Sequence, residues 1–198
     1  MMLHKRQEPR AASAEIHEDV SRDAIADAFR KAMVSHLRSH MPGTNINEHT
    51  LLASDYLNQF RELLMLLEAL AADPGNFAAD LQRWQPLNYE EHFARSEFRD
   101  KDLAVAAYRR APENVRERFD SAVARLQSEA LRLVASVGNA LDKKSDLKLV
   151  CDGAVSRLRI LIDNANAIAN GYVTDEVGRK GNALNQITID TLFRLRKA

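Results

Sequence analysis

The chain has 198 residues, and its 28 Lys and Arg residues balance its 28 Asp and Glu residues. This neutrality argues against a nucleic-acid-binding protein, which usually needs a basic surplus to release counterions from phosphates. The single cysteine excludes a disulfide framework within the chain and favours a reducing compartment. Because 45% of the residues are apolar while glycine and proline are few, the composition favours long helices around one core.

The N-terminal sequence MMLHKRQEPRAASAE is polar and contains no apolar stretch of the kind found in secretory signals. We expect residues 1–12 to form a disordered arm. The most apolar run, LLMLLEALAA, includes Glu68 and is shorter than the ~18 residues that a membrane span needs. We therefore expect a soluble, cytoplasmic protein that binds neither membranes nor nucleic acid.

The first half of the chain shows helical periodicity broken by turn residues. The pattern begins near Ser13 and stops at Pro42, which predicts one amphipathic helix. Asn45 and Glu48 have the spacing of a capping box and predict that a second helix starts there and ends before Asp73. Three shorter helices are expected at residues 74–84, 88–96 and 101–110.

The second half carries the strongest pattern. Apolar residues step by four and three through two segments, which are joined by a polar turn at 142–146 with Ser145 as the expected cap. Each segment would be roughly 40 Å long as a helix, so together they predict an antiparallel hairpin over 112–172. One hairpin leaves apolar surface uncovered. We therefore expect an all-α bundle over 13–172, and a homodimer.

After Tyr172 the periodicity ends. Residues 173–183 contain Gly178 and Gly181 and are expected to form a flexible linker. Residues 184–198 follow and begin with LNQITIDTLF. So short an amphipathic segment does not hold a helix alone in water, but it can fold into a groove on a partner. Packing on its own bundle is the alternative.

The run Gln-Ile-Thr-Ile-Asp-Thr-Leu-Phe at 186–193 resembles the C-terminal peptide of the chemotaxis phosphatase CheZ and the N-terminal peptide of the flagellar switch protein FliM. In both families that peptide binds the response regulator CheY. CheZ also has a helical hairpin, a linker and this peptide in the same order as residues 112–193. The Asp-Leu-Thr-Gly-Gln run of the CheZ hairpin has no counterpart here. The candidate partner-binding residues are Gln186, Ile187, Ile189, Asp190, Leu192 and Phe193.

The resemblance implies a CheY-like partner and an auxiliary phosphatase. Since the regulator brings its own metal and lysine, the helper need only supply an amide to orient water and an acid to engage the regulator's cation. Two acid–amide pairs lie one helical turn apart. Asp55 lies one turn from Asn58 and Gln59, and its spacing to Gln59 equals the Asp/Gln spacing found in CheZ. Asp163 precedes Asn166 with a spacing similar to that of the CheX and CheC phosphatases. Either pair could instead be an ordinary solvated face.

Other functions stay open on the sequence alone. A scaffold bundle without catalysis is one, and a histidine phosphotransfer module that uses His36 is another. His36 and His40 are four residues apart and could share an ion, but no Glu-x-x-His pair accompanies them, so we expect no metal and no cofactor. The aromatic run from Trp84 to Phe93 is either a packed corner or a recognition patch.

Overall fold

The structure is a computed structural model, which describes residues 21–143 and 146–172. These residues form seven α-helices and one 3₁₀ helix, with no β-strand among them, so the all-α fold class is confirmed. The arm predicted at 1–12, the linker at 173–183 and the docking segment at 184–198 lie outside the described residues.

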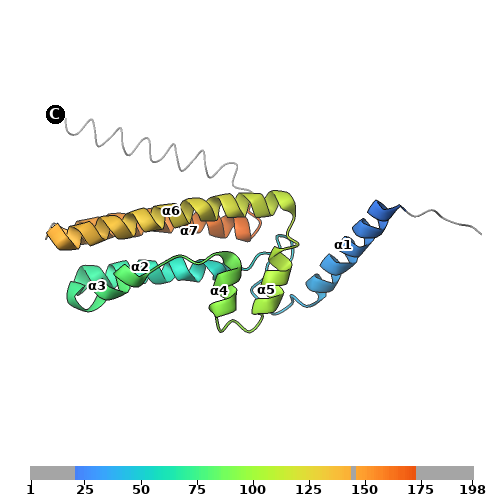
Figure 1. Ribbon diagram of the computed structural model, residues 1–198, viewed down its shortest axis with the longest axis horizontal. Helices are drawn as coiled ribbons and strands as arrows, with labels where there is room; N and C mark the ends of the chain where they lie inside the picture. The colour runs from blue at the N-terminus through green and yellow to red at the C-terminus, as the bar shows by residue number, and fades with distance from the viewer. Residues whose placement is uncertain (1–20, 144–145, 173–198) are drawn as a thin grey trace, which may run out of the picture.

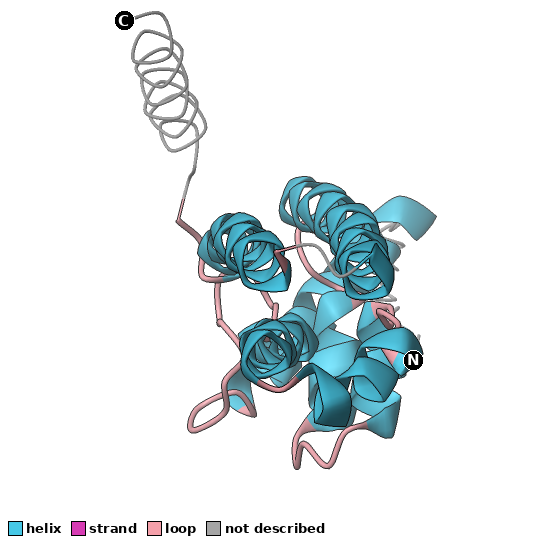
Figure 2. Cartoon of the chain, turned by 90° about the vertical axis from the view of Figure 1, so that its left-hand side faces the viewer, coloured by secondary structure: helices cyan, strands magenta, loops and turns pink. Residues whose placement is uncertain are grey.

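Four helices form the body of the molecule: α2 (Asn58–Ala72), α3 (Pro74–Arg83), α6 (Glu113–Lys143) and α7 (Leu147–Ala169). Contacts join α2 to α3, α3 to α6, α6 to α7, and α7 back to α2. Each of these helices therefore packs against two others, and neighbours in this ring run in opposite directions (Figures 1 and 2). The apolar stripes of α6 and α7 are covered by α2 and α3 of the same chain. Uncovered apolar stripes were the reason to expect a homodimer, and here α2 and α3 cover those stripes.

The stripe predicted on α6 is the side that the helix buries. Burying large apolar side chains at this spacing removes a continuous strip from water, with each Leu or Phe contributing about 1.5–3 kcal/mol. Helix α7 is capped by Asp146, whose carboxylate accepts a hydrogen bond from the Leu149 N–H at 3.1 Å. The predicted cap at Ser145 is corrected to Asp146, because an aspartate one residue later caps a helix equally well. The buried residues of α6 are Phe119, Val123, Leu126, Ala130, Leu133, Val137 and Ala140.

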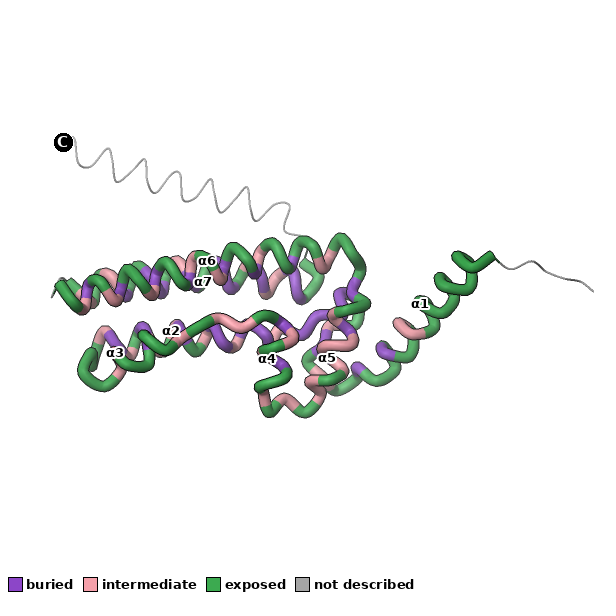
Figure 3. The backbone as a smooth tube through the Cα atoms, viewed as in Figure 1, coloured by how far each residue is buried: buried purple, intermediate pink, exposed green. Residues whose placement is uncertain are grey.

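Helix α1 (Arg22–Ser39) projects away from the body (Figure 1). Most of its surface is exposed (Figure 3), and only Leu37 is buried in the core. Within the described residues the helix starts after Ser21, whose hydroxyl accepts from the Ala24 N–H at 3.1 Å. The predicted start near Ser13 lies outside the described residues.

The capping box predicted at Asn45 and Glu48 is wrong. The Asn47 side-chain oxygen accepts instead from the N–H groups of His49 and Thr50, at 3.0 and 2.9 Å, which makes a tight turn. Such local side-chain bonds compete with helix formation. A 3₁₀ helix, η1 (Ser54–Leu57), then leads into α2.

Two short helices, α4 (Tyr89–Arg95) and α5 (Lys101–Tyr108), pack against each other beside one end of the body (Figure 1). The capping box predicted at Asn88 and Glu91 is confirmed, with each side chain bonded to the other residue's backbone N–H. Tyr89 and Phe93 are buried here. The aromatic run that includes them therefore forms a packed corner.

Candidate functional site

The first acid–amide pair lies where η1 meets α2, and its glutamine is buried. The Gln59 amide nitrogen donates to the carbonyl oxygens of Tyr56 and Leu87, both at 3.3 Å. Its oxygen accepts from the Leu87 N–H at 2.8 Å. Gln59 thus holds the extended segment after α3 against α2. A side chain fixed in this way is not available to orient a water molecule for a partner.

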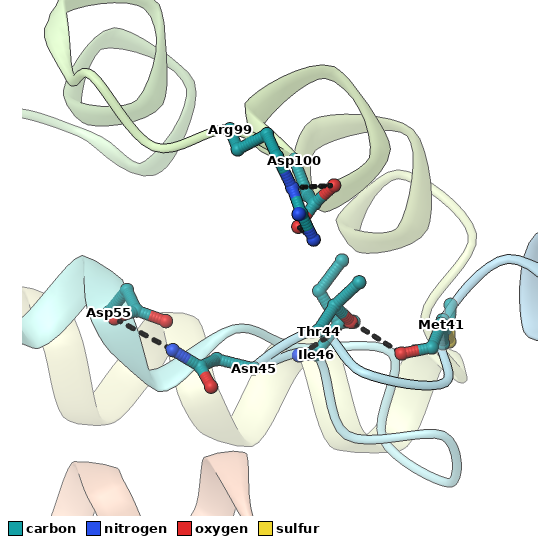
Figure 4. Close-up of polar contacts among 7 residues, drawn as sticks. All are labelled: Met41, Thr44, Asn45, Ile46, Asp55, Arg99 and Asp100. Carbon is teal, nitrogen blue, oxygen red and sulfur yellow. Dashed lines mark hydrogen bonds and ion pairs between the residues drawn. The ribbon is translucent and has the colours of Figure 1, made fainter.

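Asp55 and Asn58 are also engaged with neighbours. Asn58 and Asn45 each donate to the same Asp55 oxygen, at 3.4 Å; Figure 4 shows the contact from Asn45. Asn58 accepts from the Arg61 guanidinium at 2.7 Å. The second Asp55 oxygen is buried and has no hydrogen-bond partner among the described residues. One of the two Asp55 carboxylate oxygens is therefore turned into the fold.

A residue that sequence reasoning missed completes this corner. Gln127 of α6 donates to the Tyr56 hydroxyl and to the Leu87 carbonyl oxygen, both at 3.2 Å. The Tyr56 hydroxyl donates to the same carbonyl at 3.0 Å, and burial raises the pKa of Tyr56 well above its usual value. The only available signal was a polar residue beside the buried Leu126, which is common on any amphipathic helix.

The second pair lies on α7 and is accessible. Asp163 is exposed, and within the described residues it has no hydrogen bond or ion pair. Asn166 is half-buried one turn later. Its side-chain oxygen accepts from Asn170 at 3.3 Å, while its amide nitrogen makes no hydrogen bond to any described residue. This acid and this amide can therefore both reach a bound partner.

A groove runs between the first half of α6 and the second half of α7, with a volume of about 540 Å³. We call it the α6–α7 groove. Asn164 of α7 contributes to its lining. A smaller cavity of about 140 Å³ shares Arg118 and Ile168 with the groove and extends to Tyr172. The groove is lined by Glu117, Arg118, Ser121, Ala122, Arg125, Asn164 and Ile168.

A charged cluster fixes α6 against α7 beyond this groove. Glu129 of α6 accepts from Arg132 at 2.9 and 2.8 Å and from Arg157 of α7 at 3.1 Å. Arg132 and then Arg157 lower the pKa of Glu129 to about 2. Both arginines therefore have Glu129 as their ion-pair partner. Arg125, by contrast, has no hydrogen bond or ion pair within the described part of the chain.

A second groove, the α4–α5 groove, has a volume of about 520 Å³. Glu90 and Arg109 form a bidentate ion pair at it, with the Arg109 Nε 2.8 Å from Glu90 Oε1. Its acidic and basic side chains are equal in number, so the groove favours neither an acidic nor a basic partner. The lining residues are Glu90, Glu91, Phe93, Ala94, Lys101, Asp102, Val105, Ala106, Arg109 and Arg110.

The described histidines do not gather with other metal-binding side chains into one cluster. His36 and His40 have ring centroids 4.5 Å apart at the end of α1. No group of three metal-binding side chains occurs in residues 21–143 and 146–172. His36 lies outside the four-helix body, whereas a phosphotransfer histidine belongs in the middle of a bundle helix.

Comparisons with known protein families, with curated proteins and with solved structures found no match for this chain. The segment that resembles the CheZ peptide lies beyond Tyr172, outside the described residues, so the resemblance rests on its sequence. Across the described ranges, no helix combines the length and apolarity needed to cross a membrane.

Proposed function

We propose that this protein binds a CheY-like response regulator in the cytoplasm through residues 186–193. The observation that carries the proposal is the Gln-x-x-Ile-Asp-x-Leu-Phe run, which follows a helical body and a glycine-containing segment. A short run with four apolar side chains and one acid, Asp190, suits a groove on a partner's surface.

The arrangement of the body supports this proposal. Residues 173–183 number eleven and can span at most roughly 36–40 Å. Asp163 lies six residues before Ala169, where α7 ends, a rise of roughly 9 Å along the helix, and Tyr172 follows three residues later. A regulator held at 186–193 is therefore within reach of the acid–amide pair on α7.

Binding is tested by titrating the full chain against the CheY-like regulators of the genome that encodes it. Phe193→Ala should weaken binding strongly because it removes an aromatic anchor. Such a loss is typically about 2 kcal/mol or more, which corresponds to a ~30-fold loss of affinity. Leu195→Ala is the matched control, since it truncates a neighbouring apolar residue outside the run. Equal effects of the two substitutions, or no binding to any regulator, would contradict the proposal.

A phosphatase function is the second proposal, favoured by the accessible pair on α7. Water attacks the phosphorus of the regulator's aspartyl phosphate, the phosphorus–oxygen bond to the aspartate breaks, and carboxylate and inorganic phosphate result. The Asn166 amide would orient the water, while Asp163 engages the cation that the regulator supplies. If the chain binds a regulator but leaves the decay rate of its phosphoryl group unchanged, the protein is a scaffold without catalysis.

The homodimer remains a prediction. Any second copy would have to use a surface other than the stripes of α6 and α7, because α2 and α3 cover them. Two large apolar side chains of α1, Ile25 and Phe29, are 57% and 64% exposed. Sedimentation of the full chain tests this, and a monomer at all concentrations would contradict it.

A further inference from the structure

We propose that a pocket where α4 and α5 meet α6 binds the guanidinium group of an organic cation, through aromatic rings and the carboxylates of Asp120 and Glu91. We call it the tyrosine pocket. It lies at the end of the body where α4 and α5 pack (Figure 1), and it includes no residue of α7 or of 173–198. The inference is therefore independent of regulator binding.

The tyrosine pocket consists of two adjoining cavities. The inner cavity has a volume of about 130 Å³ and the outer one a volume of about 400 Å³. Asn88, Tyr89 and Tyr108 line both cavities, so the outer cavity leads to the inner one. A protein cavity of ~150 Å³ can hold a benzene molecule, and a guanidinium group is smaller than benzene. The inner cavity therefore has room for this group.

Aromatic rings form much of the wall of the inner cavity. Tyr89 and Tyr108 are stacked, with ring centroids 4.3 Å apart and ring planes at 15°. Tyr89 is buried and Tyr108 is half-buried, so Tyr89 supports the ring that a ligand can reach. Tyr56 and Phe119 also line this cavity. Aromatic rings attract cations, and a guanidinium group is planar and weakly hydrated, so it stacks on them more readily than an ammonium group does.

The charge of the tyrosine pocket is negative. Among the described residues, no lysine or arginine lines either cavity, whereas Glu90, Glu91 and Asp120 do. Glu90 is neutralised by its ion pair with Arg109. Glu91 and Asp120 form no ion pair with any residue in the described part of the chain. Arg116 lies nearby but lines neither cavity, so the lining carries uncompensated negative charge.

Asp120 is held in place by a tyrosine. The Tyr108 hydroxyl donates to one Asp120 oxygen at 2.8 Å, and the other oxygen has no hydrogen bond to a described residue. Burial, and then the bond to Asp120, raise the pKa of Tyr108 to about 12. The hydroxyl therefore stays protonated and keeps the free carboxylate oxygen available to a ligand.

Two further acceptors line the tyrosine pocket. One Glu91 oxygen accepts from the Asn88 N–H at the start of α4, which leaves its other oxygen without a partner in the described ranges. Gln127 turns its amide nitrogen toward the Leu87 carbonyl, so its side-chain oxygen is also free of described partners. A guanidinium group carries several N–H donors and no acceptor, and it complements a lining of this kind.

The test titrates the full chain with butylguanidinium and with butylurea, an uncharged compound of nearly the same shape. Binding is followed by the shifts of backbone amide signals in two-dimensional NMR spectra. Butylguanidinium should shift signals from α4, α5 and the first turns of α6, and should bind roughly ten-fold more tightly than butylurea, because only its charge engages the carboxylates. Equal binding of the two compounds, or no shift of these signals at about 10 mM butylguanidinium, would overturn the inference.

Substitutions locate the binding site. Asp120→Asn should weaken butylguanidinium binding roughly ten-fold, because it removes a carboxylate at an exposed position. Tyr108→Leu should also weaken binding, and Tyr108→Phe should weaken it less because the ring remains. Glu117→Gln is the matched control, since it removes an acid from α6 at the α6–α7 groove, and it should leave the affinity unchanged. Equal affinities of Asp120→Asn and Glu117→Gln would contradict the proposed site, and unfolding midpoints verify that each variant is folded.

The guanidinium group can belong to a free small molecule or to an arginine of another protein. N-acetylarginine amide, with N-acetylcitrulline amide as its uncharged counterpart, distinguishes these sources. Tighter binding of the arginine derivative than of butylguanidinium would support an arginine side chain, and weaker binding would support a small molecule. If neither cation binds more tightly than its uncharged counterpart, the inference is overturned. None of these titrations contains a regulator, so their result does not depend on the proposed function.

Discussion

The two acid–amide pairs have nearly the same spacing in the sequence and opposite environments in the fold. Gln59 is buried and bonded to both backbone groups of Leu87, whereas Asn166 keeps its amide nitrogen accessible on α7. The difference arises because the extended segment after α3 lies beside the start of α2, where its backbone takes hydrogen bonds from Gln59. Among the described residues, Asn166 on α7 has no neighbouring backbone segment to which it supplies such bonds. Residue spacing identifies candidates for chemistry, but the backbone's need for partners decides which of them remain available.

The largest effect should come from removing the structural member of the first pair. Gln59→Ala leaves the buried N–H and carbonyl of Leu87 short of partners, and should lower the free energy of unfolding by about 3 kcal/mol. Asn166→Ala should change it by less than about 0.5 kcal/mol. Urea unfolding of both variants measures this difference. A similar small loss in both would mean that Gln59 is not structural.

The next effect concerns catalysis. Asn166→Ala should slow the stimulated loss of phosphate from a bound regulator by about ten-fold or more, because a donor that positions the attacking water is removed. Decay of the phosphorylated regulator is measured at saturating chain, so that binding does not limit the rate. An unchanged rate would exclude Asn166 and direct attention to Asn164, which is adjacent to Asp163.

Acid should weaken the contact that positions α7. The folded-state pKa of Glu129, about 2, lies below its ordinary value of 4.5, so the carboxylate contributes stability above about pH 4.5. This contribution falls as the pH drops from 4.5 toward 2. Glu129→Gln should cost about 1 kcal/mol near neutral pH, a modest amount because both arginines are partly exposed. The difference from wild type should vanish near pH 2, which unfolding curves across that range would reveal.

The smallest effect is expected at Asp55. One of its oxygens is buried without a partner in the described structure, and the other has only contacts of 3.4 Å. Asp55→Asn removes the cost of burying a charge along with these weak contacts, so the net change should be within about 0.5 kcal/mol. A loss of several kcal/mol in urea unfolding would show that the carboxylate is essential to the corner.

The regular parts of the fold were predictable from the sequence. The apolar stripe of α6 follows from periodicity, and the spacing of Asn88 and Glu91 predicts the start of α4. Both features depend on interactions within a few residues. The turn at Asn47 was missed, since the same residue types serve in turns and in helix caps. The closure of the body by α2 and α3 depends on contacts between distant segments, which periodicity does not specify.

The candidate site was predicted only in part. In the structure Asp163 is exposed and Asn166 is half-buried, whereas Gln59 is buried, and the sequence did not distinguish the two pairs. The role of Gln59 depends on Leu87, which lies 28 residues away and forms no recognisable motif with it. The α6–α7 groove joins residues of two helices more than 35 positions apart, so the net charge of the whole chain gave no sign of it.

The most direct test of the account is the decay of a regulator's aspartyl phosphate in the presence of two variants, Asp163→Asn and Asp55→Asn. We predict that the wild-type chain and Asp55→Asn accelerate the decay equally, while Asp163→Asn binds the regulator and accelerates it little. Acceleration that survives in Asp163→Asn and disappears in Asp55→Asn, or no acceleration by the wild-type chain, would contradict it.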